Sequence, residues 1–263
     1  MIKTRKNLGQ NFLKDSRVLD RIAAVLNIVP EDIVVEIGPG HGELTRRILA
    51  YSPRGLIAVE KDPGLIVHHL QELVATHRGL RVIQGDALTE IPRLADGELS
   101  TTSYKLVGNI PYYITGRLLR VVGELEHKPA TIVLTIQKEV AEKLCAQPPK
   151  MNLLADSVQA WGEPEIIRYV SRKSFNPSPR VDSATIRIAP REKEPGANFY
   201  PFIHALFSQP RKTTLNNLKT LGLPRETIEE GLARAGVGPK VRPQDLDMEQ
   251  IEKLSILFTR AQS

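Results

Sequence analysis

The fold of this protein is decided by residues 34–45, which read Val-Val-Glu-Ile-Gly-Pro-Gly-His-Gly-Glu-Leu-Thr. Apolar residues lead into Glu36, glycines alternate at positions 38, 40 and 42, and a helical pattern follows from Leu44. This order predicts a buried strand that turns tightly into a helix. Because glycine lacks a Cβ and tolerates positive φ, a ligand can lie against such a turn, and the first helical amides offer unpaired donors. We therefore expect a cofactor site here, with Gly38 and Gly40 among its residues.

The spacing of the glycines indicates which ligand the turn holds. A dinucleotide site has the pattern G-x-G-x-x-G and a P-loop has a lysine, whereas this chain has E-x-G-x-G-x-G and no such lysine. A carboxylate inside the loop disfavours a pyrophosphate and suits a cationic or hydroxyl-rich ligand. The pattern therefore favours S-adenosylmethionine over NAD or ATP, and an ordinary tight turn of an α/β protein is the alternative.

Composition and charge indicate a globular, cytoplasmic protein. A chain of 263 residues with 41% hydrophobic and 25% charged residues can bury a core, which excludes disordered and fibrous classes. The formal net charge of +6 fits a polyanionic partner such as nucleic acid. A single cysteine excludes an internal disulfide, and the six histidines lack a metal-binding spacing. No signal peptide, transmembrane helix or metal is expected.

From residue 33 onward, strand-like and helix-like segments alternate. Strands are predicted at residues 33–37, 55–60, 81–84, 104–109 and 132–137, with helices at 44–51 and 63–76. The alternation is typical of βαβ units and predicts a parallel sheet with helices on both faces. Ligands of such sheets bind at the carboxyl ends of the strands.

Two of these strand ends carry acids. Glu60 ends the second strand, 22 positions beyond Gly38, where its carboxylate can accept both hydroxyls of an adenosine ribose. Asp86 follows the third strand and can accept a hydrogen bond from the adenine amine. Each has a simpler interpretation: Glu60 as a solvated strand end beside Lys61, and Asp86 as part of a common Gly-Asp turn.

The fourth strand end carries the residues expected to do the chemistry, Asn109-Ile110-Pro111-Tyr112. The exocyclic amine of a base is a poor nucleophile, because its lone pair is delocalised into the ring. Hydrogen bonds from that amine to the Asn109 side-chain oxygen and the Ile110 carbonyl would favour a tetrahedral nitrogen and aim its lone pair at a methyl donor. Tyr112 can stack on the base. The alternative is a structural turn with its tyrosines in the core.

A basic, proline-stiffened loop at residues 171–183 contains one aromatic residue, Phe175. This ring could form the second wall of a base sandwich, or it could be buried beneath a solvated connector. A polar linker follows the next strand, so we place a domain boundary between residues 190 and 191. Residues 191–263 are predicted to be all helical, with helices at 199–207, 213–221, 225–235 and 248–260. Arg211, Lys212 and Lys219 give this part a candidate basic edge.

The N-terminal arm, residues 1–16, is polar and basic and precedes a helix predicted from Ser16, its expected N-cap, to Leu26. With Phe12 and Leu13 as its only strong anchors, the arm could fold over a neighbouring site. Physical reasoning alone favours the alternative, a frayed terminus pinned by Phe12.

Several stretches together resemble the ribosomal RNA adenine dimethyltransferase family. In chain order they are NLGQNFL (7–13), EIGPGHGELT (36–45), GDAL (85–88), NIPYYI (109–114), FNPSPRVDS (175–183) and QPRKTTLNNL (209–218). Weak motifs that occur in one order are far more specific together than singly. The resemblance covers nearly the whole chain.

This resemblance implies a Rossmann-like, S-adenosylmethionine-dependent methyltransferase domain over residues 1–190 and a small helical domain over 191–263. Its expected reaction is methyl transfer to the N6 amines of two adjacent adenines near the 3′ end of small-subunit ribosomal RNA. The expected partner is the immature small ribosomal subunit, bound by a monomer during ribosome biogenesis. By position, the resemblance assigns the cofactor pocket to Asn11, Leu13, Gly38, Glu60, Asp86 and Asn109. It also places Asn109 and Tyr112 at the target base with Phe175 opposite, and favours a folded arm over a frayed one.

One segment departs from the family pattern. Between residues 143 and 158 members usually carry a Tyr-Gly-Arg-Leu-Ser-like stretch, whereas residues 146–154 here read Ala-Gln-Pro-Pro-Lys-Met-Asn-Leu-Leu. RNA docking is therefore expected to differ, with the cofactor and amine sites intact. Two other functions stay open: a large-subunit adenine methyltransferase of the macrolide-resistance type, and a non-catalytic assembly or transcription factor on the same fold.

Overall fold

The computed structural model describes residues 10–192, 195–196 and 198–260. Its internal contacts divide the chain into two compact units. The first contains the described residues up to Ala141 together with Pro164–Pro190, and the second contains Glu142–Glu163 and the described residues from Arg191 onward. A single cut after residue 190 therefore does not reproduce this division, because residues 142–163 pack with the C-terminal helices.

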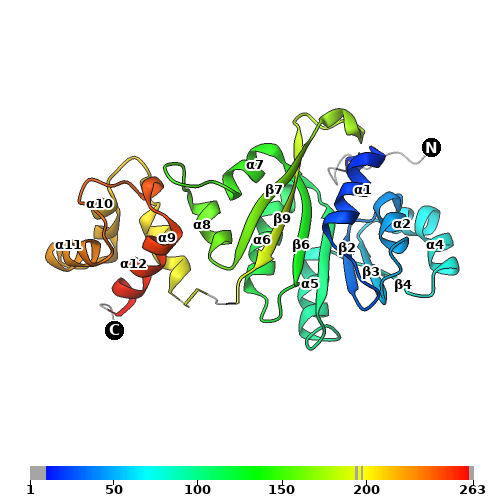
Figure 1. The fold of residues 1–263 in the computed structure, drawn as a ribbon, viewed down its shortest axis with the longest axis horizontal. Coiled ribbons are helices and arrows are strands. Elements are labelled where there is room, and N and C mark those ends of the chain that lie inside the picture. The colour runs from blue at the N-terminus through cyan, green and yellow to red at the C-terminus, as the bar shows by residue number, and fades with distance from the viewer. Residues whose placement is uncertain (1–9, 193–194, 197, 261–263) are drawn as a thin grey trace. The chain divides into compact units, whose positions relative to one another are not determined.

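The first unit is built on a seven-stranded sheet in the order β4-β3-β2-β5-β6-β9-β7 (Figure 1). Neighbouring strands from β4 to β6 run parallel, and β9 runs antiparallel to β6. The strands are β2 (Ile33–Ile37), β3 (Gly55–Glu60), β4 (Leu80–Gln84), β5 (Tyr104–Asn109), β6 (Thr131–Gln137), β7 (Gly162–Val170) and β9 (Ser183–Pro190). This arrangement confirms the α/β sheet predicted from the alternating pattern.

Helices cover both faces of this sheet because the strand order reverses direction after β4. Right-handed crossovers place the helices that join β2, β3 and β4 on one face, and those that join β4, β5 and β6 on the other. The helices are α1 (Ser16–Val25), α2 (Glu43–Leu49), α3 (Pro63–Leu65), α4 (Gln71–Thr76), α5 (Ala87–Asp96), α6 (Thr115–Glu124) and α7 (Lys138–Leu144). A π-helical turn η2 (Ile66–Leu70) joins α3 to α4, and 3₁₀ turns are η3 (Tyr112–Ile114) and η4 (Arg172–Ser174).

The first helix begins one residue away from the predicted cap. Asp15, rather than Ser16, is the N-cap of α1, and its side chain accepts a 3.0 Å hydrogen bond from the Arg17 amide. The same carboxylate also accepts a hydrogen bond from the Ser174 hydroxyl at 3.2 Å. Both residue types cap helices well, and this second contact, far away in the sequence, favours Asp15.

A two-stranded antiparallel ribbon ties the arm to the loop at 171–183. It pairs β1 (Phe12–Leu13) with β8 (Phe175–Asn176), so that Leu13 lies opposite Phe175. Both of these side chains are buried in the core of the first unit, at 3% and 5% exposure. The described part of the arm is therefore packed; residues 7–9 of the NLGQNFL motif lie outside the described residues.

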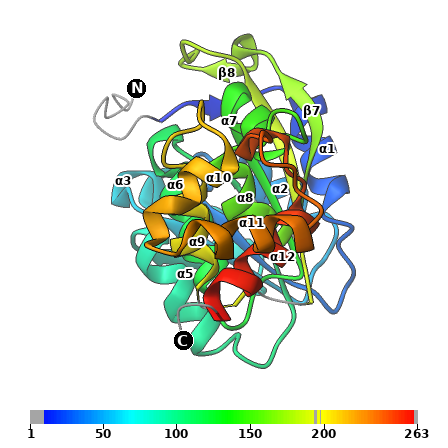
Figure 2. The same ribbon diagram turned by 90° about the vertical axis from the view of Figure 1, so that its left-hand side faces the viewer.

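The second unit has its own apolar core, in which Phe202 and Phe258 stack with their centroids 6.2 Å apart. Figure 2 shows its C-terminal helices gathered together. The helices are α8 (Leu153–Gln159), α9 (Phe199–Leu206), α10 (Thr214–Leu218), α11 (Arg225–Arg234) and α12 (Met248–Arg260), with 3₁₀ turns η5 (Lys219–Leu221) and η6 (Pro243–Asp245). In the part of the chain that the structure describes, none of the helices combines the length and apolarity needed to span a bilayer.

The atypical segment at 146–154 is an ordered part of this second unit. Asn152 caps α8 by accepting hydrogen bonds from the Leu154 and Ala155 amides. Gln159 donates to the carbonyls of residues 144 and 146 at 2.9 Å each, and the Met151 amide donates to the carbonyl of residue 244 at 3.0 Å. The departure from the family pattern therefore lies within the helical unit, whereas the glycine turn belongs to the first unit.

Candidate active site

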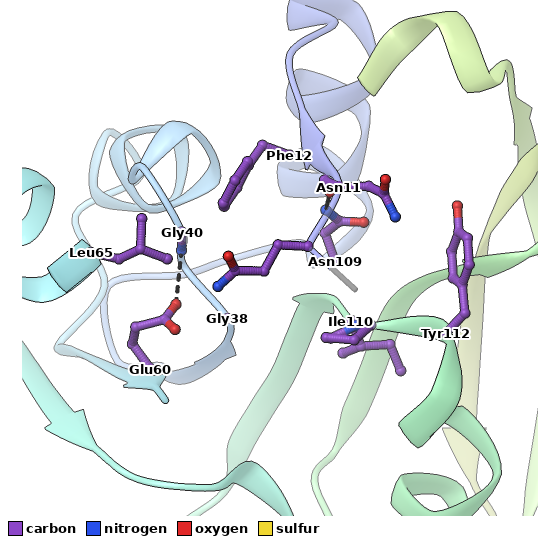
Figure 3. A pocket seen from close by; sticks show the side chains of 11 residues that line it. Asn11, Phe12, Gly38, Gly40, Glu60, Leu65, Asn109, Ile110 and Tyr112 are labelled. Atoms are coloured by element: carbon purple, nitrogen blue, oxygen red, sulfur yellow. Dashed lines mark hydrogen bonds between the residues drawn. The ribbon is translucent and has the colours of Figure 1, made fainter. Parts of the chain in front are cut away.

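One pocket lies where β2, β3 and β5 end (Figure 3). Its lining combines backbone from the glycine turn, side chains of two strand ends and residues of the arm: Gln10, Asn11, Phe12, Gly38, Gly40, Glu60, Leu65, Asn109, Ile110, Pro111 and Tyr112. In Figure 3 the Gly40–Glu60 pair and Tyr112 lie at opposite ends, with Asn109 between them. The structure thus brings together all the predicted site residues except Leu13, Asp86 and Phe175.

Two of those three residues line adjoining pockets. Asp86 lines a second pocket that shares Gly38, Glu60 and Pro111 with the first. Leu13 lines a smaller third pocket, which shares Gly38 and Asn109 with the first. The shared walls make the three pockets parts of one extended site along the carboxyl edge of the sheet.

The glycine turn requires glycine for two different reasons. Gly38 and Gly40 have φ values of 64° and 60°, in the left-handed region that other residues adopt only with strain. A Cβ on Gly40 would also lie 2.9 Å from the ring of Phe12. The turn is therefore shaped both by its own backbone and by the arm that lies on it.

Glu60 is held in place by backbone amides. Its side chain, in a residue only 4% exposed, accepts hydrogen bonds from Gly40 N at 3.2 Å and Asp62 N at 2.8 Å. Burial raises the pKa of this carboxyl, while the two amides act against the shift. Each oxygen keeps an unused lone pair, so that the group can accept hydroxyl hydrogens from a ligand in the pocket.

Glu36 differs from the charged carboxylate that the loop pattern suggested. The residue is fully buried, its Oε2 accepts a 2.7 Å hydrogen bond from the Thr45 hydroxyl, and burial raises its pKa to about 8. Because it is mostly neutral at pH 7, it adds less negative charge to the loop than the sequence argument assumed. Glu60 and Asp86 are the better acceptors for a ligand.

Asp86 remains ionised because of its partners. Its Oδ2 lies 2.9 Å from Lys61 Nζ, and this hydrogen bond is the main cause that lowers its pKa. Its Oδ1 accepts a 3.0 Å hydrogen bond from the Leu88 amide and so caps α5. A carboxylate has further acceptor capacity, which the second pocket makes available to an amine.

The side chain of Asn109 is oriented by the arm. Its Nδ2 donates a 2.8 Å hydrogen bond to the carbonyl oxygen of Asn11. The donor end of the amide is therefore engaged, which leaves Oδ1 as an acceptor at the pocket. Nearby, the Tyr112 hydroxyl is 2.7 Å from the Ser183 hydroxyl, a contact that fixes the ring at its outer end.

A cluster of three aromatic rings, not anticipated from the sequence, holds the arm over the glycine turn. The centroids of Phe12 and His41 are 4.0 Å apart, and those of His41 and His69 are 4.4 Å apart. His41 Nδ1 also lies 3.6 Å from Glu43 Oε1. No sequence motif marks the contact, because His69 lies on η2 and Phe12 on the arm.

Phe175 requires a correction. The resemblance to the family placed its ring opposite Tyr112 at the target base, but the structure buries it in the core and pairs its backbone with Leu13. It lines none of the three pockets. The alternative interpretation, a ring buried beneath a connector, describes this structure, because pairing between β1 and β8 turns the side chain inward.

The site offers acceptors and an aromatic ring but no metal cluster. Among the described residues, no three His, Cys, Asp or Glu side chains gather where they could share a metal ion. The arrangement suits binding and orientation of an amine between Asn109 and Tyr112, beside a ligand held by Glu60 and Asp86.

Comparison with known proteins agrees with this geometry. The family profile for "Ribosomal RNA adenine dimethylase" matches residues 1–260. Ribosomal RNA small subunit methyltransferase A of Dehalococcoides mccartyi strain 195 is 37% identical over 98% of this chain and 89% of its own length. The protein of that name from Moorella thermoacetica is 38% identical, over 95% and 91%.

Two solved structures share the fold. A dimethyladenosine transferase from Plasmodium falciparum has a TM-score of 0.79 at 26% identity, covering 95% of this chain and 98% of its own. The 23S rRNA methyltransferase ErmE has a TM-score of 0.77 at 28% identity, covering 95% and 100%. The protein is thus an enzyme with a Rossmann-like methyltransferase domain, and the chain belongs to the ribosomal RNA adenine dimethylase family.

Proposed function

We propose that this enzyme transfers methyl groups from S-adenosylmethionine to the N6 amines of two adjacent adenines near the 3′ end of small-subunit ribosomal RNA. Relatives that are 37–38% identical over nearly the whole chain carry the name of small-subunit ribosomal RNA methyltransferases. The observation that carries the proposal is the hydrogen bond from Asn109 Nδ2 to the Asn11 carbonyl, which engages the donor end of the amide and leaves its oxygen to accept from an amine.

The pocket has the donors and acceptors that this cofactor needs. Glu60 can accept the ribose hydroxyls, and Asp86 can accept the adenine amine from the adjoining pocket. The glycine turn lets the ligand lie against the backbone, while Asn11 and Leu13 close the side formed by the arm. When bound, S-adenosylmethionine supplies an electrophilic methyl group on a sulfonium, so the protein needs neither a nucleophile nor a metal.

The residues around Asn109 position the amine. Asn109 Oδ1 and the carbonyl of Ile110 would accept its two N–H groups, which favours a tetrahedral nitrogen with its lone pair aimed at the methyl group. The same two acceptors stabilise the positive charge that nitrogen gains as the bond forms. Tyr112 would stack on the adenine, and the extra proton then leaves to solvent.

The helical unit supplies a basic edge for RNA. Arg211, Lys212 and Lys219 are exposed, and they flank the buried side chain of Asn217. Asn217 stabilises the turn before α10, because its Oδ1 accepts hydrogen bonds from the Ser208 hydroxyl and the Gln209 amide. We propose that this edge contacts phosphates of the immature small ribosomal subunit, and that the enzyme acts in the cytoplasm as a monomer.

The test is methyl transfer from labelled S-adenosylmethionine to immature small subunits, followed by separation of the product nucleosides. Dimethyladenosine at two adjacent positions is the expected product. Asn109→Ala should abolish incorporation while cofactor binding falls much less, because the variant loses the amine acceptor and keeps Glu60 and Asp86. Incorporation only into protein-free large-subunit RNA would instead establish a large-subunit methyltransferase. Binding of cofactor and RNA without any transfer would indicate an assembly factor.

A further inference from the structure

The mouth of the second pocket carries an exposed tyrosine that the proposed chemistry does not use. Tyr113 is 61% exposed and borders this pocket beside Lys61 and Asp86. Its neighbour Tyr112, in contrast, is half-buried and fixed to the Ser183 hydroxyl. An aromatic ring that is largely free in solvent at the edge of a functional pocket is a surface for a flat partner.

Two cationic side chains lie beside this ring. Arg117 follows Tyr113 by four residues, one turn along η3 and α6, so that both project from the same side of the segment. Its positive charge also helps to lower the pKa of Asp86, although the main cause is the hydrogen bond from Lys61. Arg117 is exposed and makes no hydrogen bond or ion pair with any residue that the structure describes. Lys61, 56% exposed at its side chain, is neutralised by Asp86, so Arg117 leaves the group with one net positive charge.

The surface between these side chains is open. Gly116 is exposed, and a Cβ placed on it would meet no atom within 4 Å. A flexible chain could therefore lie along the start of α6 without displacing protein.

The charge of this surface shows which ligand it fits. S-adenosylmethionine carries no phosphate, and the part of it that Asp86 would bind in this pocket, the adenine, is uncharged, so cations at the rim do not serve the cofactor. Single-stranded RNA carries a phosphate for each base, and it binds where aromatic rings alternate with basic side chains.

We propose that Tyr113, Lys61 and Arg117 form a rim subsite for the RNA nucleotide next to the target adenine. Tyr113 stacks on its base, and Arg117 with Lys61 contacts its phosphate. The subsite rests on the proposed function, in which the target base lies on Tyr112. Because the pocket that Tyr112 lines and the pocket that Tyr113 borders share Pro111, the rim subsite adjoins the target base. It therefore receives the second of the two adjacent adenines while the first is methylated.

The experiment measures kcat and KM on immature small subunits, and the cofactor dissociation constant without RNA, for Tyr113→Ala and Tyr113→Phe. Tyr113→Ala should raise KM for the subunits about 5- to 100-fold, the effect of one lost base–aromatic stack, while Tyr113→Phe stays near wild type. Arg117→Gln should lower the salt dependence of RNA binding by about one phosphate contact. Tyr169→Ala is the matched control, because Tyr169 is 53% exposed and lies beside Lys138, 5.1 Å from its ring centroid, but on β7.

Two results would overturn the rim subsite. One is a KM for Tyr113→Ala no higher than that of Tyr169→Ala. The other is a rise in the cofactor dissociation constant of Tyr113→Ala, measured without RNA, that is as large as the rise in its KM. That result would assign Tyr113 to the cofactor pocket. If wild-type protein methylates no subunits, the proposed function fails. Binding of a short adenine-rich single-stranded RNA, followed by fluorescence anisotropy with the same variants, then decides the rim subsite separately.

Discussion

The phenyl ring of Phe12 lies on the imidazole of His41, with 4.0 Å between the ring centroids and 35° between their planes. His41 belongs to the glycine turn, whereas Phe12 belongs to the arm whose Asn11 carbonyl orients Asn109. On its other side the arm pairs with β8. The stack is therefore the contact through which the glycine turn holds the residues that complete the cofactor pocket.

His41→Ala is expected to raise the dissociation constant for S-adenosylmethionine about 2- to 10-fold, the equivalent of one aromatic pair. The alanine removes the surface on which Phe12 rests, so Asn11 and Leu13 are less often in place. His41→Phe keeps the stack and should stay close to wild type. Calorimetry measures the dissociation constant, and His68→Ala is the control, because His68 is an exposed histidine next to His69 in the sequence. Equal affinities for wild type and His41→Ala would show that the arm is held without the stack.

Gly40→Ala is expected to weaken cofactor binding at least tenfold and to destabilise the fold by about 1–2 kcal/mol, because the left-handed backbone is strained and the new Cβ meets Phe12. Gly236→Ala isolates the backbone cost, since Gly236 has φ 71° and open space around its Cβ position. That control should lose stability but not cofactor affinity. If the clash is real, the double variant Gly40→Ala with Phe12→Ala should lose less cofactor affinity than the two single losses added together. Strictly additive losses in calorimetry would contradict the contact.

The sheet was predictable from the sequence, and its surroundings were less so. The strands at 33–37, 55–60 and 104–109 have the predicted bounds, because a central parallel strand is buried on both faces and reads as one apolar run. Their carboxyl ends supply Gly38, Glu60 and Asn109, so this part of the site followed from the strands. The Phe12–His41 stack did not, because it joins two segments that only folding brings together.

The two clearest departures have the same cause. Phe175 is buried because β8 pairs with an arm residue far away in the sequence, and residues 142–163 join the helical unit through tertiary packing. Neither contact leaves a periodic pattern in its own segment. A local reading of the loop at 171–183 could therefore identify an aromatic residue without showing which way its ring points.

Glu60→Gln is expected to raise the cofactor dissociation constant about 10- to 100-fold, because the variant loses a charged acceptor for the ribose hydroxyls. Glu60→Ala should bind still more weakly. It should also lower the free energy of unfolding by about 1–3 kcal/mol for each buried amide, Gly40 N and Asp62 N, that loses its acceptor. Calorimetry and urea denaturation measure the two effects separately. An unchanged dissociation constant in Glu60→Gln would remove Glu60 from the cofactor site.

The side chain of Asp156 lowers the stability of the helical unit. The residue lies on α8 and is fully buried, and neither carboxyl oxygen has a hydrogen-bond partner among the described residues. Burial raises its pKa to about 8. Asp156→Leu should raise the free energy of unfolding at pH 7 by about 1–3 kcal/mol, because an unpaired buried polar group is replaced by an apolar one.

The pH dependence of this residue has a definite sign. Between pH 4 and pH 8 the unfolded chain has lost the Asp156 proton while the folded chain keeps it, so stability falls as pH rises. The slope from this one group approaches about 1.4 kcal/mol per pH unit within that window. Urea denaturation at several pH values should therefore show the largest gain of Asp156→Leu over wild type near pH 8 and the smallest near pH 4. Glu230→Gln neutralises an exposed carboxylate in the same unit and should leave the wild-type slope. If the free energies of unfolding of Asp156→Leu and wild type changed in parallel with pH, the carboxyl would be ionised in the folded protein and would have a partner after all.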